Sequence, residues 1–203
     1  MDNTTININR TEFLGQTKES IQACIDGDRY SQSKLYEQFA PKMFAVCMRY
    51  SKSREEAEDI LQDGFVQVFK SLHTFRFAGS FEGWIRRIMV FVAIANYRTK
   101  PKMHAVVNNV ENFSGLEVID NTNEDVISML GKKELLNIVQ ALPPTYRMVF
   151  NLYVFEGLKH REIAKELGIT EGTSKSNFFD AKVILRKAII NSMKIAKQSS
   201  SNG

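Results

Sequence analysis

The sequence is poor in cysteine and histidine, and this shortage excludes two classes of protein. Only two cysteines and three histidines occur among 203 residues, and Cys24 and Cys47 form no CxxC motif. We therefore expect neither a disulfide framework nor a zinc site, and we predict no metal and no cofactor. We expect both to be buried free thiols, as is typical of a protein in a reducing compartment.

Long hydrophobic runs and secretion signals are also missing. The N-terminal residues MDNTTININRTEF are polar and lack the basic start and apolar core of a signal peptide. No uninterrupted apolar stretch approaches the length that crosses a bilayer. We therefore expect a cytoplasmic protein that does not insert into a membrane.

The usual signatures of catalysis are absent as well. The sequence has no glycine-rich phosphate loop, and His73, His104 and His160 stand apart from suitable nucleophiles. We therefore do not expect an enzyme. The charge balance of 27 basic and 23 acidic residues, with a net charge of +4, permits nucleic-acid binding without requiring it.

Helical periodicity dominates what remains, because turn-bounded runs with alternating polarity are scarce. We predict an all-α fold of two small helical domains joined by a flexible acidic linker, the second domain containing a helix-turn-helix. The expected segments are a flexible arm (1–16), a first domain (17–100), the linker (101–123), a second domain (124–192) and a flexible tail (193–203).

The second domain holds the clearest motif, at residues 158–190. Ile163 and Leu167 lie at helical spacing, Gly168 suits a left-handed turn, and Thr170 is placed to cap a second helix. That helix carries an apolar stripe of Phe178, Ala181, Leu185 and Ala188. Its opposite side suits a DNA major groove, although an ordinary helical hairpin with a solvated polar face has the same pattern. We expect the helical pattern to end near Ile190.

The first domain offers two candidate surfaces. Residues 54–72 form a helix that starts at a capping box of Ser53 and Glu56. Its polar face contains Asp59, Gln62, Asp63 and Val66, which suits either a docking patch or a solvated surface.

Residues 75–100 begin with an aromatic loop and continue as a helix capped by Ser80. Basic side chains interleaved with aromatic ones are typical of single-stranded DNA binding, although Phe81 and Trp84 also fit a core. We expect an inner face of Phe81, Trp84, Ile85, Ile88, Val92 and Ala95, and an outer side of Arg86, Arg87, Tyr97 and Arg98 with Val90 and Ile94.

Three stretches together resemble bacterial sigma factors of the extracytoplasmic-function group, in the sigma-70 family. LKHREIAKELGITEGTSKS is similar to the region that reads the upstream promoter element. REEAEDILQDGFVQVFKSL is similar to the helix that contacts the clamp helices of the largest core RNA polymerase subunit, and FRFAGSFEGWIRRIMVFVAIANYRTK to the region that opens the promoter. The resemblance implies core RNA polymerase and promoter DNA, duplex upstream and single-stranded downstream, as partners. An anti-sigma factor is a further candidate partner.

The resemblance also implies site residues. By this resemblance, the residues that bind core polymerase are Asp59, Gln62, Asp63 and Val66. Phe65 is expected in the hydrophobic core of the protein itself. The resemblance places at base edges of the upstream element Lys175, Ser176, Phe179 and Asp180. It places closer to the phosphates Thr173, Lys182 and Arg186. Downstream DNA falls to Arg76, Phe77, Trp84 and Arg87, with residues 75–80 as the pocket for a flipped base. Many relatives carry other residues at Phe91, Ala95, Asn177 and Asp180, so we expect altered base preferences.

Two alternatives use the same features differently. A helix-turn-helix regulator would bind DNA without joining polymerase, and its N-terminal half would bind a ligand or a second copy. A helical adaptor would use its basic residues only for solubility and would show no salt-sensitive DNA binding.

Overall fold

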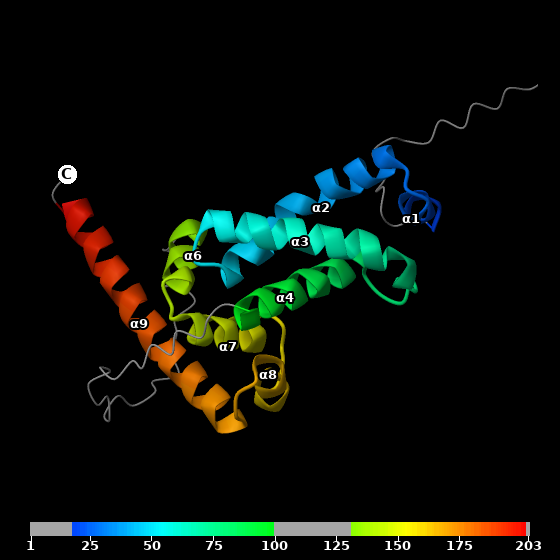
Figure 1. The fold of residues 1–203 in the computed structure, drawn as a ribbon. Coiled ribbons are helices and arrows are strands. Elements are labelled where there is room, and N and C mark those ends of the chain that lie inside the picture. The colour runs from blue at the N-terminus through cyan, green and yellow to red at the C-terminus, as the bar shows by residue number, and fades with distance from the viewer. Residues whose placement is uncertain (1–17, 100–130, 202–203) are drawn as a thin grey trace, which may run out of the picture. The chain divides into compact units, whose positions relative to one another are not determined.

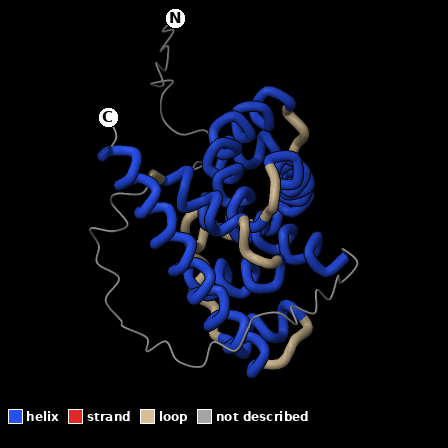
Figure 2. The backbone as a smooth tube through the Cα atoms, turned by 90° about the vertical axis from the view of Figure 1, so that its left-hand side faces the viewer, coloured by secondary structure: helices blue, strands red, loops and turns tan. Residues whose placement is uncertain are grey.

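The structure is a computed structural model that describes residues 18–99 and 131–201. Every regular element in these two ranges is a helix, as Figure 2 shows, so the all-α prediction is confirmed. None of these helices combines the length and apolar character needed to cross a bilayer. The arm predicted for 1–16 and the linker predicted for 101–123 lie outside the described residues.

Packing divides the chain into two units. The first unit takes its described residues from Met1–Cys47 and Ala57–Val92, and the second from Met48–Glu56 and Ala93–Gly203. The helices α2, α3 and α4 therefore each contribute residues to both units. The boundaries predicted at residues 100 and 124 stay a prediction.

The first unit is built around three long helices. Its elements are α1 (Lys18–Ile25), α2 (Arg29–Tyr50), α3 (Arg54–Ser71), η1 (Leu72–Thr74) and α4 (Phe81–Thr99), coloured blue to green in Figure 1. Aromatic contacts join the helices: Tyr36 of α2 lies 4.6 Å from Phe65 of α3, and Phe39 lies 5.5 Å from Phe81 of α4, between ring centroids. Phe39, Phe65 and Phe81 are buried, so their rings add apolar area to the contacts between these helices, whereas Tyr36 stays partly exposed.

Side-chain caps fix where two of these helices begin. The hydroxyl of Ser53 accepts a hydrogen bond from the Glu56 amide at 3.3 Å, and the Glu56 carboxylate accepts one from the Lys52 amide at 2.8 Å. The hydroxyl of Ser80 accepts one from the Gly83 amide at 3.2 Å. Both predicted caps are confirmed, and each satisfies backbone donors that have no partner inside the helix.

The outer side predicted for α4 is partly wrong. Val90 and Ile94 are buried, with 7% and 4% of their surface exposed, and so are Met89 and Ala93. The buried part of α4 is therefore wider than the stripe expected for an amphipathic helix with one partner, because helices covered on more than one side lose the simple polar pattern. Arg87 and Arg98 remain exposed.

The second unit contains α6 (Lys132–Gln140), α7 (Pro144–Val154), α8 (His160–Leu167) and α9 (Glu171–Ser201), coloured from yellow-green to red in Figure 1. Pro144 occupies the first position of α7, where a missing amide hydrogen costs nothing. One cluster of buried side chains joins α9 to the end of α6, and it consists of Ile138, Leu142, Ala181 and Leu185. Helical pattern predicted for 123–130 lies outside the described residues.

The turn between α6 and α7 is closed by a buried arginine. Only 4% of Arg147 is exposed, and its Nη1 donates to the carbonyl oxygens of Gln140 at 2.6 Å and Leu142 at 3.4 Å. These carbonyls at the end of α6 would otherwise lack a partner. Arg147 thereby holds residues 140–142, the connection between α6 and α7, in a defined conformation.

The prediction that helical structure ends near Ile190 is wrong, because α9 continues to Ser201. The residues after Ile190 include Met, Lys, Ala and Gln, which are all strong helix formers. Intrinsic propensity can extend a helix that packing has already nucleated, even where no apolar stripe remains.

Candidate nucleic-acid interface

Helices α8 and α9 form the expected helix-turn-helix. Gly168 ends α8 in the left-handed region at φ 66°, and the Thr170 hydroxyl accepts a hydrogen bond from the Thr173 amide at 3.0 Å. In α8, Ile163 and Leu167 are buried, as their spacing predicts. The short turn therefore fixes the N-terminal end of α9 next to α8, whose inner side is buried.

An aromatic cluster fixes α8 and α9 to each other and to α7. The ring of His160 stacks on Tyr153 with 4.7 Å between centroids, and Tyr153 lies 4.4 Å from Phe178. His160 Nδ1 is also 3.0 Å from the hydroxyl of Ser174, which is completely buried. Burial, with a smaller contribution from the nearby Lys175 ammonium, lowers the pKa of His160, while Glu171 opposes the shift.

The outward side of α9 carries most of the predicted DNA-binding residues. Those that are exposed are Thr173, Lys175, Ser176, Phe179, Lys182 and Arg186. Phe179 is 44% exposed, although burial would be favourable for so large an apolar residue. The ammonium of Lys175 pairs with Glu171 at 2.8 Å, and such a solvent-exposed pair is weak enough to exchange for a DNA contact.

Two other predicted positions are less accessible. Asp180 is half-buried, and its carboxylate accepts a hydrogen bond from the Tyr146 hydroxyl of α7. Burial and then the charge of Asp180 raise the pKa of Tyr146. Asn177 is 9% exposed, so this departure from the family pattern lies against the core. The family resemblance, not the helical spacing, predicted a base contact for Asp180, and Asn177 was expected only to alter the base preference.

A second surface forms around the loop of residues 75–80, which we call the aromatic loop. Phe75 lies 4.9 Å from both Phe77 and Phe81, and 5.5 Å from Trp84, between ring centroids. Phe81 is buried in the core, whereas Phe77 is 39% exposed. Exposure of the rings therefore increases from Phe81 to Phe77. Phe81 belongs to the core, and Trp84 is half-buried.

Arginines border this aromatic surface. Arg76 lies within the aromatic loop and Arg87 lies one turn beyond Trp84 on α4, and both are exposed. Phe77 adopts φ 57°, a left-handed conformation that is unusual for a bulky residue. The loop therefore presents cations and exposed ring faces side by side, a combination typical of single-stranded nucleic-acid binding surfaces.

The polar face of α3 is exposed as predicted. Asp59, Gln62 and Asp63 all reach solvent, and Val66 beside them is 47% exposed. Phe65 is 3% exposed and packs inward, as expected. We call Asp59, Gln62, Asp63 and Val66 the docking face.

Sequence reasoning missed a close approach of α3 and α4. Gly64 is buried, and a Cβ added there would fall well inside van der Waals contact with the thioether of Met89. A glycine within an otherwise helical stretch was the available signal, because glycine disfavours helix and needs a packing reason. Because glycine has no side chain, α4, which carries Trp84 and Arg87, can lie directly on α3 at this position.

Helices α8 and α9 place the protein in the helix-turn-helix class, a fold class typical of DNA-binding proteins. The family described as Sigma-70 region 2 matches residues 35–102, and Sigma-70, region 4 matches residues 132–185. A similar protein is the ECF RNA polymerase sigma factor SigE of Mycolicibacterium smegmatis, 31% identical over 160 residues. That match covers 77% of this chain, which spans 60% of the relative's length.

Another relative is similar over almost its full length. The RNA polymerase sigma-H factor of Pseudomonas aeruginosa is 25% identical over 181 residues, which cover 86% of this chain and 94% of the relative. Among solved structures, the sigma factor RpoE in complex with the anti-sigma factor NepR from Bartonella quintana matches at 17% identity and a TM-score of 0.44. That match covers 77% of this chain and 95% of the other.

The chain belongs to the sigma-70 family of RNA polymerase sigma factors, within the extracytoplasmic-function group. Members of this family are transcription initiation factors. Both family regions occur here in one chain, in the order 2 and then 4, which disfavours a helix-turn-helix regulator that acts alone.

Proposed function

We propose that this protein binds core RNA polymerase and directs it to a specific set of promoters, where it helps to separate the strands and start transcription. The observation that carries the proposal is the presence of both sigma regions, each with its outward polar or aromatic surface. The protein itself then performs no catalytic step, because the polymerase makes the RNA. It acts in the cytoplasm, where polymerase and DNA are found.

The docking face is proposed to bind the polymerase. Its two carboxylates and one amide surround an exposed apolar side chain, Val66, in the pattern of an interface centre with a polar rim. Negative charge on this face would favour a basic partner and speed association. The packing of Phe65 beneath keeps the face in place.

The aromatic loop is proposed to hold unpaired bases of the downstream promoter element. Phe77 and Trp84 offer ring faces, and Arg76 and Arg87 offer cations for phosphates. Taking a base out of the duplex costs stacking energy, which aromatic contacts of about 1 to 3 kcal/mol per base can offset.

Helix α9, which we call the reading helix, is proposed to read the upstream element in the major groove. Lys175, Ser176 and Phe179 would contact base edges, because they project from the end of α9 that the turn presents. Phosphates would be bound by Thr173, Lys182 and Arg186. Asp180 would accept a hydrogen bond from a cytosine in addition to the one from the Tyr146 hydroxyl, because a carboxylate can accept several.

Reconstitution with purified bacterial core polymerase tests the proposal. Run-off transcription on genomic fragments should give discrete transcripts that require this protein, and the variant Asp59→Asn/Asp63→Asn should lose retention by the core enzyme. Glu37→Gln is the matched control, because Glu37 is an exposed carboxylate of the same unit on α2. Retention of the docking variant equal to wild type would exclude the docking face, and absence of any association with core would exclude the function.

A further inference from the structure

A lysine that precedes the family match lies against the aromatic loop. Lys18 is the first residue of α1, and the region 2 match begins only at residue 35. Its Nζ lies 5.7 Å from the centroid of the Phe77 ring. This is within the range at which an ammonium is attracted to an aromatic face.

The core fixes the position of this lysine. Ile21 and Cys24 of α1 are 2% and 4% exposed, so one side of this short helix is buried. Helix α1 packs against η1, which runs directly into the aromatic loop (Figure 1). Lys18 itself is exposed, so its charge remains available at the rim of the loop.

Phe77, the ring beneath Lys18, is held in a costly arrangement. Its backbone is left-handed at φ 57° and its ring is 39% exposed, so neither local preference nor burial favours the observed conformation. Contact with Phe75 at 4.9 Å and with the Lys18 ammonium holds the ring. An exposed ring next to a cation is suited to a ligand that presents a flat apolar face and a negative charge.

An unpaired nucleotide has these two features. Its base stacks on an aromatic ring, and its phosphate attracts a lysine. We propose that Lys18 is a further DNA-binding residue, whose ammonium binds the phosphate of the unpaired nucleotide that stacks on Phe77. The inference rests on the proposed function and makes α1 a part of the downstream DNA site.

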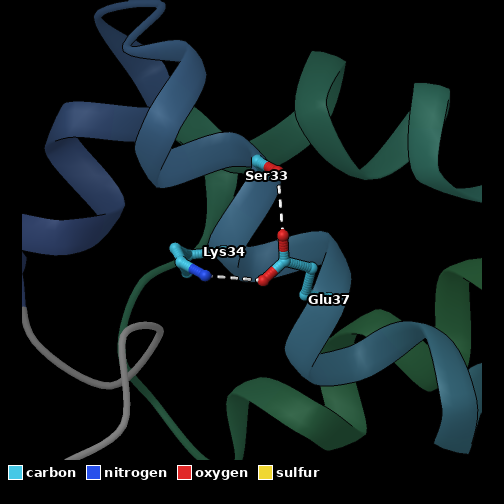
Figure 3. A network of polar contacts seen from close by, with 3 residues as sticks. All are labelled: Ser33, Lys34 and Glu37. Carbon is cyan, nitrogen blue, oxygen red and sulfur yellow. Dashed lines mark hydrogen bonds and ion pairs between the residues drawn. The ribbon is translucent and has the colours of Figure 1, made fainter. Parts of the chain in front are cut away.

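The chain contains a matched comparison at Lys34. Its Nζ lies 5.8 Å from the Tyr30 ring, but it also pairs with the Glu37 carboxylate at 2.7 Å. The second carboxylate oxygen of Glu37 accepts a hydrogen bond from the Ser33 hydroxyl at 3.2 Å, as Figure 3 shows. Among the described residues no ion pair includes Lys18, so Lys18 and Lys34 share a ring contact but differ in free charge.

The test uses the full-length protein with purified core polymerase and a promoter fork that is duplex upstream and single-stranded downstream. Binding is measured over a series of salt concentrations. Lys18→Gln should weaken fork binding about fivefold and reduce the slope of log affinity against log salt by about 0.7, the value for one phosphate contact on a single strand. Lys18→Arg should keep the wild-type affinity and slope, and Lys34→Gln should change neither.

The outcomes separate three possibilities. A weaker Lys18→Gln complex with an unchanged salt slope would indicate a structural role and would overturn the inference. An Lys18→Gln variant that matches wild type in both quantities would overturn it as well. If the wild-type protein fails to bind core or fork, the proposed function fails first, whereas wild-type binding with an unaffected Lys18→Gln variant leaves that function intact.

Discussion

The N-terminal end of α9 and the aromatic loop present their proposed DNA-binding groups in opposite ways. In α9, Ser174 and Ala181 are completely buried, so the exposed Lys175 and Phe179 project from a surface that the core holds in one orientation. The aromatic loop contacts the core through Phe75, which lies against the buried ring of Phe81, and otherwise depends on contacts among partly exposed rings and on a left-handed residue.

The difference follows from the two forms of DNA. A major groove has a fixed width and a fixed pattern of donors and acceptors, so a rigid helix can be matched to it before binding. An unpaired base has to be taken out of a stack, so its binding site needs exposed ring faces that are empty until the base arrives. A site for the major groove therefore needs a helix held by buried side chains, whereas a site for an unpaired base needs rings that are only partly buried.

Removing the reading groups should have the largest effect. We expect Lys175→Ala/Phe179→Ala to lower transcription from the cognate duplex promoter by about a hundredfold, because each base contact contributes about 1 to 3 kcal/mol of discrimination. Core binding should not change. The measurement is run-off transcription, with Lys165→Ala, an exposed lysine of α8, as the control.

The same variant sharpens the comparison on altered DNA. A template with a pre-opened downstream segment still requires the upstream contacts, so the loss should persist there. Normal initiation by Lys175→Ala/Phe179→Ala from the cognate promoter would show that the base contacts are assigned to the wrong residues.

Filling the contact at Gly64 should break the scaffold of the loop. A methyl group there must displace the buried Met89 side chain, so Gly64→Ala should lower the free energy of unfolding by about 2 kcal/mol. Thermal unfolding followed by circular dichroism should show a midpoint several degrees lower. In Gly83→Ala the new methyl would meet only Ser80, at 3.6 Å, so this control should be neutral or stabilising.

Upstream duplex binding reports on the other unit of the same variant. Because α9 and its core cluster belong to the second unit, binding of an isolated upstream duplex at low temperature should be close to wild type. An unfolding midpoint of Gly64→Ala equal to that of Gly83→Ala would show that α3 and α4 do not meet as described.

Removing the exposed ring of the aromatic loop should have a smaller effect. Phe77→Gly deletes the ring and lets the backbone adopt φ 57° without strain, so stability should be kept or rise. Initiation from duplex promoters should fall about tenfold, because one base would lose its stacking partner. Tyr30→Gly is unsuitable as a control inside a helix, so Tyr30→Ala, which removes an exposed ring of α2, serves instead.

A pre-opened template distinguishes this defect from the upstream one. The loop variant should recover most of its activity when the strands are already separated, in contrast to Lys175→Ala/Phe179→Ala. Equal defects of Phe77→Gly on closed and open templates would contradict a role in strand separation.

Local signals made much of this fold predictable from sequence. Thr170, Ser80 and Gly168 act through groups within a few residues of themselves, so their spacing is enough to place helix ends. The polar face of α3 was predictable for the same reason, since one helix has one regular period.

Features that depend on distant partners were not predictable. The burial of Val90 and Ile94, the contact of Gly64 with Met89 and the hydrogen bond from Tyr146 to Asp180 all depend on which helix lies opposite. A single sequence gives the period of a helix but not the number of its partners. The exposure of Lys175 and Phe179 on α9 was therefore predictable, whereas the partial burial of Asp180 was not.

The smallest effect should come from His160, which tests whether burial holds the reading helix. Its pKa is lowered mainly by burial, so the unfolded chain binds a proton more readily than the folded one. Stability should therefore be full above the ordinary value of about 6.5 and fall as the pH drops below it. The groups around the ring are Tyr153, Phe178 and the Ser174 hydroxyl, with the charges of Lys175 and Glu171 nearby. Between pH 7.5 and 5.5 the unfolding midpoint of wild type should fall by a few degrees more than that of His160→Gln, whereas His73→Gln, which changes an exposed histidine, should follow wild type. If wild type and His160→Gln lose stability in parallel, protonation at His160 does not loosen α8 from α9, and the reading helix is held by its apolar contacts alone.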